Sequence, residues 1–417
     1  MISANWAGNY QYGARELASP ASLEQLQELV ATTPRIKALG SRHSFNDVAD
    51  TEGTQVSLAG LPRELTIDES ARTVRVNAGA KYGEFVEELA EAGWAIHNLA
   101  SLPHISVAGA VATGTHGSGD RNGILGTAVA ALEFVTANGE IARAKRGDPD
   151  FDGLVVSLGA LGVVTSVTLD IEPRFDVRQD VFENLGWPQL LAHFDEVTSA
   201  AYSVSMFTNW DENGASQVWL KSRVDADVTG ASGAELFGAA KATQQRHPLP
   251  GGPSEYTTEQ GGVSGPWWKR LAHFKLEFTP SNGEELQTEY LVPRAHAIAA
   301  IEATRRLGPR ISPHLFISEI RTMAADELWL SPSYGHDSVG IHFTWKQEAA
   351  VTALLREIDA ALAPFDARPH WGKLFETDAT RFDSLYPRLP EFRRLAGRLD
   401  PDGKFRNAFL DRTVFAQ

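Results

Sequence analysis

The loop Gly40-Ser41-Arg42-His43-Ser44-Phe45-Asn46 directly follows the short apolar run Ile36-Lys37-Ala38-Leu39. A strand that ends in small, hydrogen-bonding residues brings backbone N–H groups close to a polar ligand, and a histidine in such a turn is held on a tight frame. The pattern therefore predicts a loop that binds an anionic group. A capped turn with a solvated imidazole is the plainer interpretation of the same residues.

A second loop, rich in glycine and threonine, lies further along the chain as Ser106-Val107-Ala108-Gly109-Ala110-Val111-Ala112-Thr113-Gly114-Thr115-His116-Gly117-Ser118-Gly119. Its glycines between 117 and 123 lack the spacing of the dinucleotide-binding fingerprint. Two loops of this composition in one domain predict a single large ligand that is held from two sides.

Length, composition and charge limit the number of domains and the kinds of partner that this chain can have. The chain has 417 residues, of which 43% are hydrophobic, so it is long enough for two or three domains with ordinary cores. Its 53 acidic and 38 basic residues give a formal net charge of −15, and no basic run interrupts this excess. Such a charge repels nucleic acid and anionic membranes. We therefore expect neither as a partner.

The sequence contains no cysteine, which excludes disulfides, thiolate catalysis, Fe–S clusters and thiolate zinc sites. Residues Met1–Gly8 lack the basic and apolar regions of a signal peptide, and no apolar run approaches the length of a membrane span. We expect a soluble cytoplasmic protein that acts as a monomer and has no metal site.

Hydrophobic periodicity predicts an α+β protein with closely spaced strands. Ser22-Leu23-Glu24-Gln25 has the spacing of a capping box and begins a helix, which a strand over Arg35–Leu39 follows. Further strands are expected over Gln55–Leu58, Leu65–Asp68, Thr73–Asn77, Ala131–Thr136, Glu140–Ala144, Ser166–Ile171, Ala201–Phe207, Gln217–Lys221, Glu285–Leu291, Leu315–Arg321 and Val339–Lys346. Further helices are expected over Tyr82–Ala92, Pro188–Ser199, Arg294–Leu307, Glu348–Ala363 and Tyr386–Arg398.

Three segments follow from this pattern. Pro173 closes the first strand-rich part, so we place a domain boundary after residue 172 and treat 173–375 as a second domain. Within it, the Gly/Pro-rich interval 225–266 has little periodicity and is expected to be a long surface excursion with one short helix. The final segment, 376–417, ends in turn-forming and apolar residues, which predicts a chain end packed back onto the body.

Two expected strands carry paired polar residues. In Leu315–Arg321, the alternation of side chains places Glu319 and Arg321 on one face and Ile320 on the other. In Val339–Lys346, His342 and Thr344 share a face in the same way. If the two strands are adjacent in a sheet, these four side chains form a polar platform on a rigid floor.

Arg368-Pro369-His370-Trp371-Gly372-Lys373 is the third polar cluster. If the chain is extended after Pro369, Lys373 lies on the same side as Trp371, and His370 lies on the other. The histidine and the lysine then need not serve the same ligand.

Each cluster also has a simpler explanation. The Glu–Arg pair on its strand, for example, is a type of pair that is more often a surface ion pair than a site. A hydrolytic triad of Ser101 or Ser106 with His342 and Glu319 is conceivable, but neither serine lies in a Gly-x-Ser-x-Gly turn. The P-loop and His-Glu-x-x-His patterns do not occur. A carbohydrate-binding or hydrolytic protein without a redox cofactor remains the alternative class.

Together with Ser157-Leu158-Gly159-Ala160-Leu161-Gly162-Val163-Val164-Thr165 and Asn98-Leu99-Ala100-Ser101-Leu102-Pro103-His104-Ile105-Ser106, these motifs resemble the vanillyl-alcohol-oxidase superfamily of flavoproteins. Within it, the resemblance is closest to the branch that oxidises alditols, and it runs over essentially the whole chain. It implies a two-domain fold, in which the FAD-binding domain takes in the N-terminal part and the C-terminal segment, and an α/β substrate domain covers the flavin.

The resemblance also implies the roles of individual residues. It implies that His43 is covalently attached to the flavin 8α-methyl group. The cofactor-binding residues it implies are Gly40, Ser41, Arg42, His43, Ser44, Ser101, Ser106, Gly109, Ala112, Thr113, Gly114, Val164 and His370. The substrate-binding residues it implies are Ser101, Glu319, Arg321, His342, Thr344 and Lys373, of which His342, Lys373 and Arg321 are the catalytic candidates.

One residue departs from the family pattern. Relatives carry Gly-Ser-Gly-His-Ser, whereas this chain has Arg42 at the second glycine, so the backbone there must accommodate a Cβ atom. We expect the Arg42 side chain to point to solvent; a position near the cofactor pyrophosphate is the alternative.

The activity implied is oxidation of the terminal hydroxyl of an alditol such as xylitol or sorbitol to the aldose, with O₂ reduced to hydrogen peroxide. Hydride transfer to flavin N5 requires a proton acceptor and stabilisation of negative charge on the flavin. Either His342 or Lys373 can be the base. The nearest alternative is an aldonolactone oxidase or dehydrogenase, because those relatives share the His-Trp-x-Lys signature.

Overall fold

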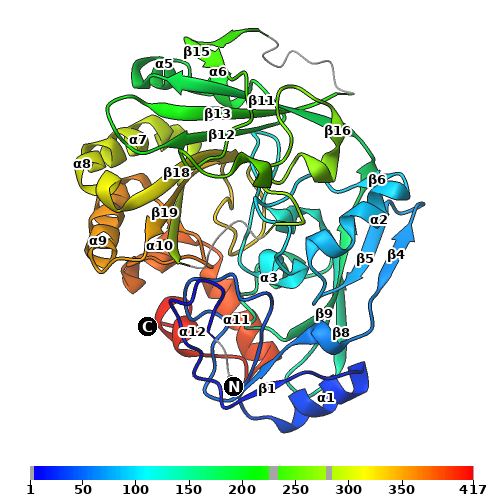
Figure 1. The fold of residues 1–417 in the computed structure, drawn as a ribbon. Helices are drawn as coiled ribbons and strands as arrows, with labels where there is room; N and C mark the ends of the chain where they lie inside the picture. The colour runs from blue at the N-terminus through cyan, green and yellow to red at the C-terminus, as the bar shows by residue number, and fades with distance from the viewer. Residues whose placement is uncertain (1–3, 225–232, 279–283, 417) are drawn as a thin grey trace.

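The computed structural model describes residues 4–224, 233–278 and 284–416 (Figure 1). Strands and short helices alternate along this part of the chain, in agreement with the α+β class expected from the sequence. No helix within these ranges is both long enough and apolar enough to cross a membrane.

The first part of the chain builds an antiparallel sheet and a small parallel one. In the antiparallel sheet, β9 lies in the middle and pairs with β5 on one side and β7 on the other. In the parallel sheet, β3 lies between β1 and β2. The strands of the antiparallel sheet, in spatial order, are β4 (Leu65–Asp68), β5 (Thr73–Asn77), β9 (Val163–Asp170), β7 (Val129–Val135) and β8 (Ile141–Lys145); those of the parallel sheet are β1 (Glu16–Ala18), β3 (Thr54–Val56) and β2 (Ile36–Ala38).

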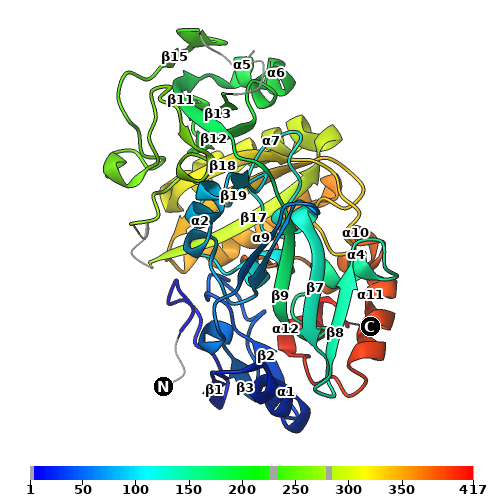
Figure 2. The same ribbon diagram turned by 90° about the vertical axis from the view of Figure 1, so that its right-hand side faces the viewer.

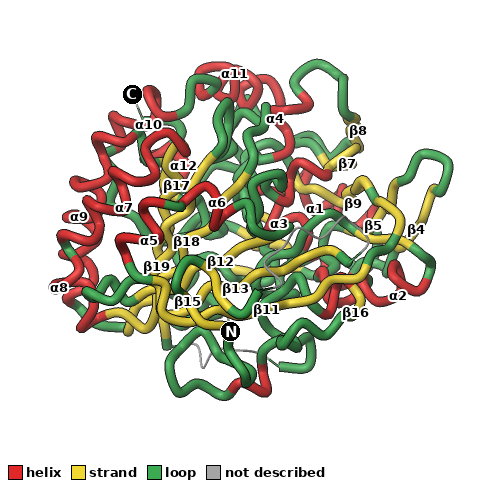
Figure 3. The backbone as a smooth tube through the Cα atoms, turned by 90° about the horizontal axis from the view of Figure 1, so that it is seen from above, coloured by secondary structure: helices red, strands yellow, loops and turns green. Residues whose placement is uncertain are grey.

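A much larger antiparallel sheet occupies the second part, and Figure 3 shows its strands running side by side across the molecule. In spatial order the strands are β14 (Glu235–Leu236), β15 (Ala239–Lys241), β11 (Asp176–Leu185), β13 (Ala215–Arg223), β12 (Ser203–Thr208), β18 (Leu315–Met323), β19 (Ser338–Lys346), β17 (Glu285–Pro293) and β20 (Arg368–Pro369), and β16 (Gly265–Pro266) also pairs with β11. A fourth sheet has only β10 (Glu172–Pro173) and β6 (Trp94–Ala95).

Helices flank both regions. Figures 1 and 2 show α5, α6, α7 and α9 beside the large sheet, and α11 and α12 beside the first part of the chain. The α-helices are α1 (Leu23–Thr32), α2 (Val86–Glu91), α3 (Val107–Ala112), α4 (Phe151–Val155), α5 (Trp187–Ala192), α6 (Phe194–Thr198), α7 (Ala297–Arg306), α8 (Gly308–Ile311), α9 (Ala350–Leu362), α10 (Phe382–Leu385), α11 (Leu389–Leu399) and α12 (Ala408–Thr413).

Local sequence explains where these elements begin and how they pack. The Ser22 hydroxyl accepts a hydrogen bond from Gln25 N (3.3 Å) and caps α1, as the capping-box spacing predicts. Apolar faces of β17, β18 and β19 pack against α7 and α9 in one core, to which Ile341 and Phe343 contribute. The first sheet, α1 to α4 and the C-terminal helices share another core.

The chain end is packed onto the body of the protein, as expected. The Asn407 side chain caps α12 and donates to the backbone oxygens of Asp47, Val48 and Asp50. Lys37 in β2 donates to Phe405 O at 3.1 Å. The segment after residue 375 therefore contacts the first part of the chain, although the domain limits at residues 172 and 375 stay a prediction.

Two expectations need correction. Strand β11 was not expected, because its sequence Asp176–Leu185 mixes charged and apolar residues; ladders to both β13 and β15 stabilise it. The interval 225–266 is not only a surface excursion. Residues 225–232 lie outside the described ranges, but β14 to β16 extend the large sheet, and His247, Pro248 and Leu249 line a cavity.

Candidate functional site

A cavity of about 380 Å³ lies between the two predicted loops and the polar face of the large sheet. Its walls come from segments far apart in the sequence, including the loop at 40–45, the start of α3, the turn at 157–159 and strands β17, β18 and β19. The predicted large ligand would thus be held from two sides.

The two loops are locked to each other. Ser41 Oγ accepts a hydrogen bond from Ser106 N (3.1 Å), and Ser106 Oγ accepts one from Ser41 N (3.3 Å). A Cβ atom on Gly40 would lie 2.4 Å from Ser106 Oγ, and one on Gly109 would lie 2.7 Å from it. These glycines are therefore required for the close approach of the two backbones.

The first loop also holds His43 in a confined position. Trp6 stacks on the imidazole with the ring centroids 5.1 Å apart, and Asn5 Nδ2 donates to Ser44 O at 2.9 Å. Burial, reinforced by the charge of Lys373, lowers the pKa of His43 to about 4, so the ring is neutral. Its Nδ1 is buried and has no hydrogen-bond partner among the described residues.

Arg42 adopts φ +66°, a left-handed conformation that normally favours glycine. The backbone therefore keeps the shape that a glycine would give, at the cost of some strain. Arg42 is half-buried and belongs to the wall of the cavity. That its side chain points to solvent stays a prediction.

The polar platform is a row of side chains across three adjacent strands. Glu319 on β18 pairs in register with His342 on β19, and His342 pairs with Glu289 on β17. Thr344 lies two residues from His342, so it faces the cavity in the next row, opposite Gln287. The expected adjacency of the two polar strands is confirmed.

Arg321 connects the row to Ser101, which precedes the second loop in the sequence. Its Nη2 donates to Glu289 Oε1 (2.9 Å), its Nε lies 3.6 Å from Glu319 Oε2, and its Nη1 donates to Ser101 Oγ (3.3 Å). Gly340 lies opposite Arg321 on β19, and a Cβ atom there would lie 3.2 Å from Glu289 Oε1, so the absence of a side chain leaves room for this carboxylate. The buried guanidinium thus lies between two carboxylates.

These contacts fix the charges of the platform. Although burial favours the neutral acids, His116 and Arg321 hold the pKa of Glu289 well below its usual range. Arg321 and His273 likewise lower the pKa of Glu319. Both acids are therefore carboxylates that can accept hydrogen bonds from a ligand.

Lys373 and His342 share one partner. Lys373 Nζ donates to Gln287 Oε1, and His342 Nε2 lies 3.2 Å from the same oxygen. Burial lowers the pKa of Lys373 to about 8 and that of His342 to about 3. At neutral pH the imidazole is uncharged, and the lysine exchanges between ammonium and amine within the physiological range.

The prediction that His370 and Lys373 lie on opposite sides of an extended chain is wrong. The chain turns at Trp371 and Gly372, with Lys373 N donating to His370 O at 3.0 Å, so both His370 and Lys373 line the cavity. The Trp371 indole instead packs in the core. Asn46 Nδ2 donates to the backbone oxygens of Trp371 and Lys373, which ties this turn to the first loop.

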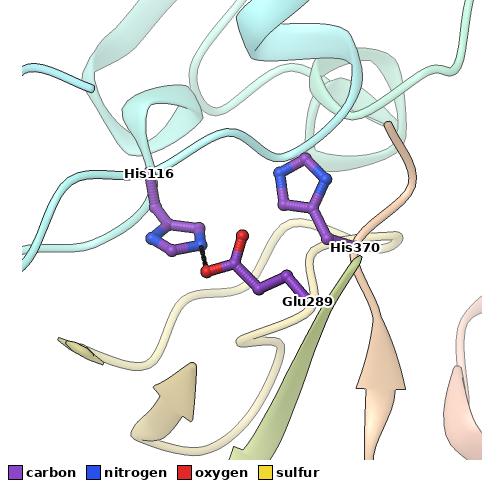
Figure 4. Close-up of side chains that lie close together, drawn as sticks. All are labelled: His116, Glu289 and His370. Atoms are coloured by element: carbon purple, nitrogen blue, oxygen red, sulfur yellow. Dashed lines mark ion pairs between the residues drawn. The ribbon is translucent and has the colours of Figure 1, made fainter. Parts of the chain in front are cut away.

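Three possible metal ligands, His116, Glu289 and His370, point toward one another with their ligand atoms within 4.8 Å (Figure 4). Two observations favour a hydrogen-bond network over a metal site. Glu289 Oε1 already accepts from Arg321 and lies 3.2 Å from His116 Nε2. Gly372 N donates to His370 Nδ1 (3.1 Å), so the neutral ring carries its proton on Nε2 and has no lone pair left for a metal.

The structure brings nearly all the predicted site residues to this cavity. The exception is Gly114, which is not in the cavity wall; a Cβ atom there would lie 2.9 Å from Pro332. The predicted residues that line the cavity are Gly40, Ser41, Arg42, His43, Ser44, Ser101, Ser106, Gly109, Ala112, Thr113, Val164, Glu319, Arg321, His342, Thr344, His370 and Lys373.

Other wall residues were missed. Gln287 and Glu289 lie on β17 in the same alternating pattern as the two polar strands, so that pattern could have found them. His116 belonged to the second loop but was not given a role. His273, which also lies in the wall, carried no local sequence signal.

The hydrolytic alternative is not supported by the contacts. Ser106 bonds to Ser41, and Ser101 accepts from Arg321, whereas His342 bonds to Gln287. A nucleophilic serine requires a histidine base within hydrogen-bond reach. Neither serine has His342 in that position.

Comparisons with known proteins agree with this geometry. A family model described as FAD binding domain matches residues 14–145, and one described as D-arabinono-1,4-lactone oxidase matches residues 281–413. The fold resembles the crystal structure of cholesterol oxidase from B. sterolicum, with a TM-score of 0.79, 15% identity and coverage of 99% of this chain and 96% of that one.

Among relatives, the chain is 29% identical to L-gulono-1,4-lactone dehydrogenase of Mycobacterium tuberculosis, over 99% of each chain. It is 24% identical to L-gulonolactone oxidase of Bos taurus, over 99% of this chain and 98% of that one. It is 50% identical to alditol oxidase of a Streptomyces species, over 97% of each chain. The chain therefore belongs to the alditol oxidase family, within the vanillyl-alcohol-oxidase superfamily of FAD-binding proteins.

Proposed function

We propose that the protein oxidises the terminal hydroxyl of open-chain alditols, such as xylitol and sorbitol, to the aldose, with FAD as cofactor and O₂ as the acceptor that becomes hydrogen peroxide. The observation that carries the proposal is the polar row of Glu319, His342 and Glu289, which faces the loop of His43 across one cavity. The 50% identity to an alditol oxidase supports the substrate class.

The residues present fit FAD. The close approach of Gly40 and Gly109 to Ser106 makes a narrow cradle lined by small side chains. His43 Nδ1, buried and without a hydrogen-bond partner, supports covalent attachment of the flavin through this residue. We infer a cofactor-binding domain from residues 1–172 and 376–417, and a substrate domain from 173–375. When bound, FAD supplies the two-electron acceptor for the hydride of the substrate carbon.

Lys373 takes the hydroxyl proton in this proposal. A general base is most effective when its pKa lies near the working pH, which matches a pKa of about 8 better than the value of about 3 at His342. Once protonated, the Lys373 ammonium stabilises the negative charge that the hydride brings to this part of the site. His342 stays neutral and orients the reacting hydroxyl.

The remaining polar residues orient the rest of the substrate. Glu319 accepts hydrogen bonds from hydroxyls, and Arg321 donates to them. Ser101 and Thr344 extend the same polar wall. Arg321 balances only one of the two carboxylates Glu319 and Glu289, so these three groups carry no positive excess that would favour an anionic substrate. The site suits a neutral chain of hydroxyl groups.

Oxidation of an aldonolactone is the second candidate. It is favoured by the match of residues 281–413, which include β17 to β19, to the D-arabinono-1,4-lactone oxidase model. The lactone enzymes found in the comparison share less of their sequence with this chain than the Streptomyces alditol oxidase does.

Peroxide release with a substrate panel tests the choice. Purified protein is supplied with xylitol, sorbitol, L-gulono-1,4-lactone and L-galactono-1,4-lactone, and peroxide is followed with a coupled peroxidase. We expect turnover of the two alditols to exceed that of the lactones. Turnover of lactones alone would contradict the proposal.

A further inference from the structure

His273 lies beside Glu319 in the wall of the cavity, and its two ring nitrogens bridge a lysine and a carboxylate. Its Nδ1 is 2.9 Å from Lys221 Nζ, and its Nε2 is 2.8 Å from Glu319 Oε1. Lys221 comes from β13 and is fully buried, whereas Glu319 faces the cavity from β18. Trp219 and Phe207 pack edge-on against the imidazole and fix its plane.

The carboxylate of Glu319 determines the tautomer of His273, because it can only accept a hydrogen bond and the neutral ring must therefore carry its proton on Nε2. Burial lowers the pKa of Lys221 to about 7, so at neutral pH its side chain is both ammonium and amine, and each form can donate to Nδ1. Lys221 Nζ donates to Leu271 O, to Ala272 O (3.1 Å) and to His273 Nδ1. His273 Nδ1 therefore has no proton, and the neutral ring carries its proton on Nε2, where it donates to Glu319 Oε1.

The charged and polar groups around His273 are consistent with this arrangement. Glu319 and Arg321 face it from β18, Lys221 faces it from β13, and Ser205 Oγ on β12 lies 3.5 Å from Nε2. Burial, together with the charge of Lys221, lowers the pKa of His273 to about 4. The ring therefore stays neutral at neutral pH.

We propose that Lys221 and His273 form a positioning pair that holds Glu319 for the substrate. With Oε1 occupied by His273, Oε2, which lies 3.6 Å from Arg321 Nε, can accept a hydrogen bond from a substrate hydroxyl in the cavity. Without this bond the carboxylate can rotate, and its alignment with Arg321 is lost. The inference rests on the proposed function, because it assigns Glu319 to a substrate hydroxyl.

Two substitutions of His273 separate its two contacts. His273→Gln can keep an N–H near the position of Nε2 and so keep the bond to Glu319. His273→Asn can keep an acceptor near the position of Nδ1 for Lys221 but loses the donor to Glu319. His314→Asn is the matched control, because His314 pairs with Glu348 away from the cavity.

Glu319 would bind a hydroxyl in both the ground state and the transition state, so its misplacement should change KM more than kcat. We expect His273→Asn to raise the KM for xylitol by about tenfold. This factor corresponds to ~1.4 kcal/mol, which is near the lower end of what one hydrogen bond to a charged group contributes. We expect kcat to change by less than about twofold, and His273→Gln to lie closer to the unsubstituted protein. An unchanged KM in His273→Asn, or equal effects of both variants, overturns the proposal.

Nitrogen NMR of histidine-labelled protein gives a test that does not depend on activity or on a folded variant. The His273 signals should show protonated Nε2 and unprotonated Nδ1, without charging of the ring down to about pH 5. A proton on Nδ1 overturns the positioning pair even if alditols are oxidised. If the unsubstituted protein has the expected tautomer but oxidises no alditol, the proposed substrate fails, and the role of Glu319 toward it fails as well.

Discussion

Replacement of Lys373 by methionine tests the proton acceptor. The substitution keeps the length and most of the apolar stem of the side chain but removes the amine that contacts Gln287 and lies 4.9 Å from the Phe45 ring. We expect a slower transfer of hydride to the flavin with little loss of bound cofactor, because no wall of the cradle is removed.

The pKa of about 8 sets the magnitude. At pH 7 about one-tenth of the Lys373 side chains are the neutral amine, and at pH 9 about nine-tenths are, so kcat/KM should rise about tenfold between these values. A general base typically contributes about 10²- to 10⁴-fold to a rate, so Lys373→Met should slow flavin reduction by at least about 100-fold and abolish the rise with pH.

The assay is anaerobic stopped-flow measurement of flavin bleaching by xylitol across pH 6–9.5, where the interval is roughly that in which a group of pKa near 8 titrates. The control is Lys145→Met, since Lys145 is exposed on β8 and does not line the cavity. A rate that falls as the pH rises through 8 would show that the ammonium form is the active one. That result, or an unchanged rate in Lys373→Met, would refute Lys373 as the base.

Three other changes probe the cofactor cradle and the buried charges. His43→Ala should release the flavin on denaturation, whereas the unsubstituted protein should keep its yellow colour after denaturation and precipitation; pigment extracted equally from both contradicts the covalent link. Gly40→Ala places a Cβ atom 2.4 Å from Ser106 Oγ and should lower the flavin-to-protein absorbance ratio; a full complement of flavin would show that the loops can yield. Glu289→Gln leaves the buried Arg321 without one of its carboxylates, so it should lower the free energy of unfolding, measured by urea titration, by about 3 kcal/mol and raise the KM for xylitol. If neither the free energy of unfolding nor the KM changes, Glu289 is not part of the platform.

Alternation along strands made the platform predictable. Glu319 with Arg321, and His342 with Thr344, were found because polar residues two positions apart on a strand must share a face. Glu289 shows the same signal in β17 but was overlooked. The partners of these side chains depend on strand order and register, and a single sequence does not specify those.

Other features depend on long-range contacts alone. The position of Lys373 follows from a turn at Gly372, which an extended-strand assumption reverses. The burial of Lys221 follows from carbonyl groups of residues 271 and 272, brought to it by the fold. Such tertiary partners leave no periodic trace in the sequence, so local patterns do not reveal a buried lysine of this kind.

The central claim is that a flavin held by His43 lies against a polar face that binds an open-chain alditol. A crystal structure of the anaerobically reduced protein with xylitol tests it most directly. We expect electron density continuous from His43 to the flavin, and the terminal hydroxyl of xylitol within hydrogen-bond distance of Lys373, with other hydroxyls on Glu319 and Arg321. Xylitol bound away from these residues, or a flavin that does not lie between them and His43, would contradict the account.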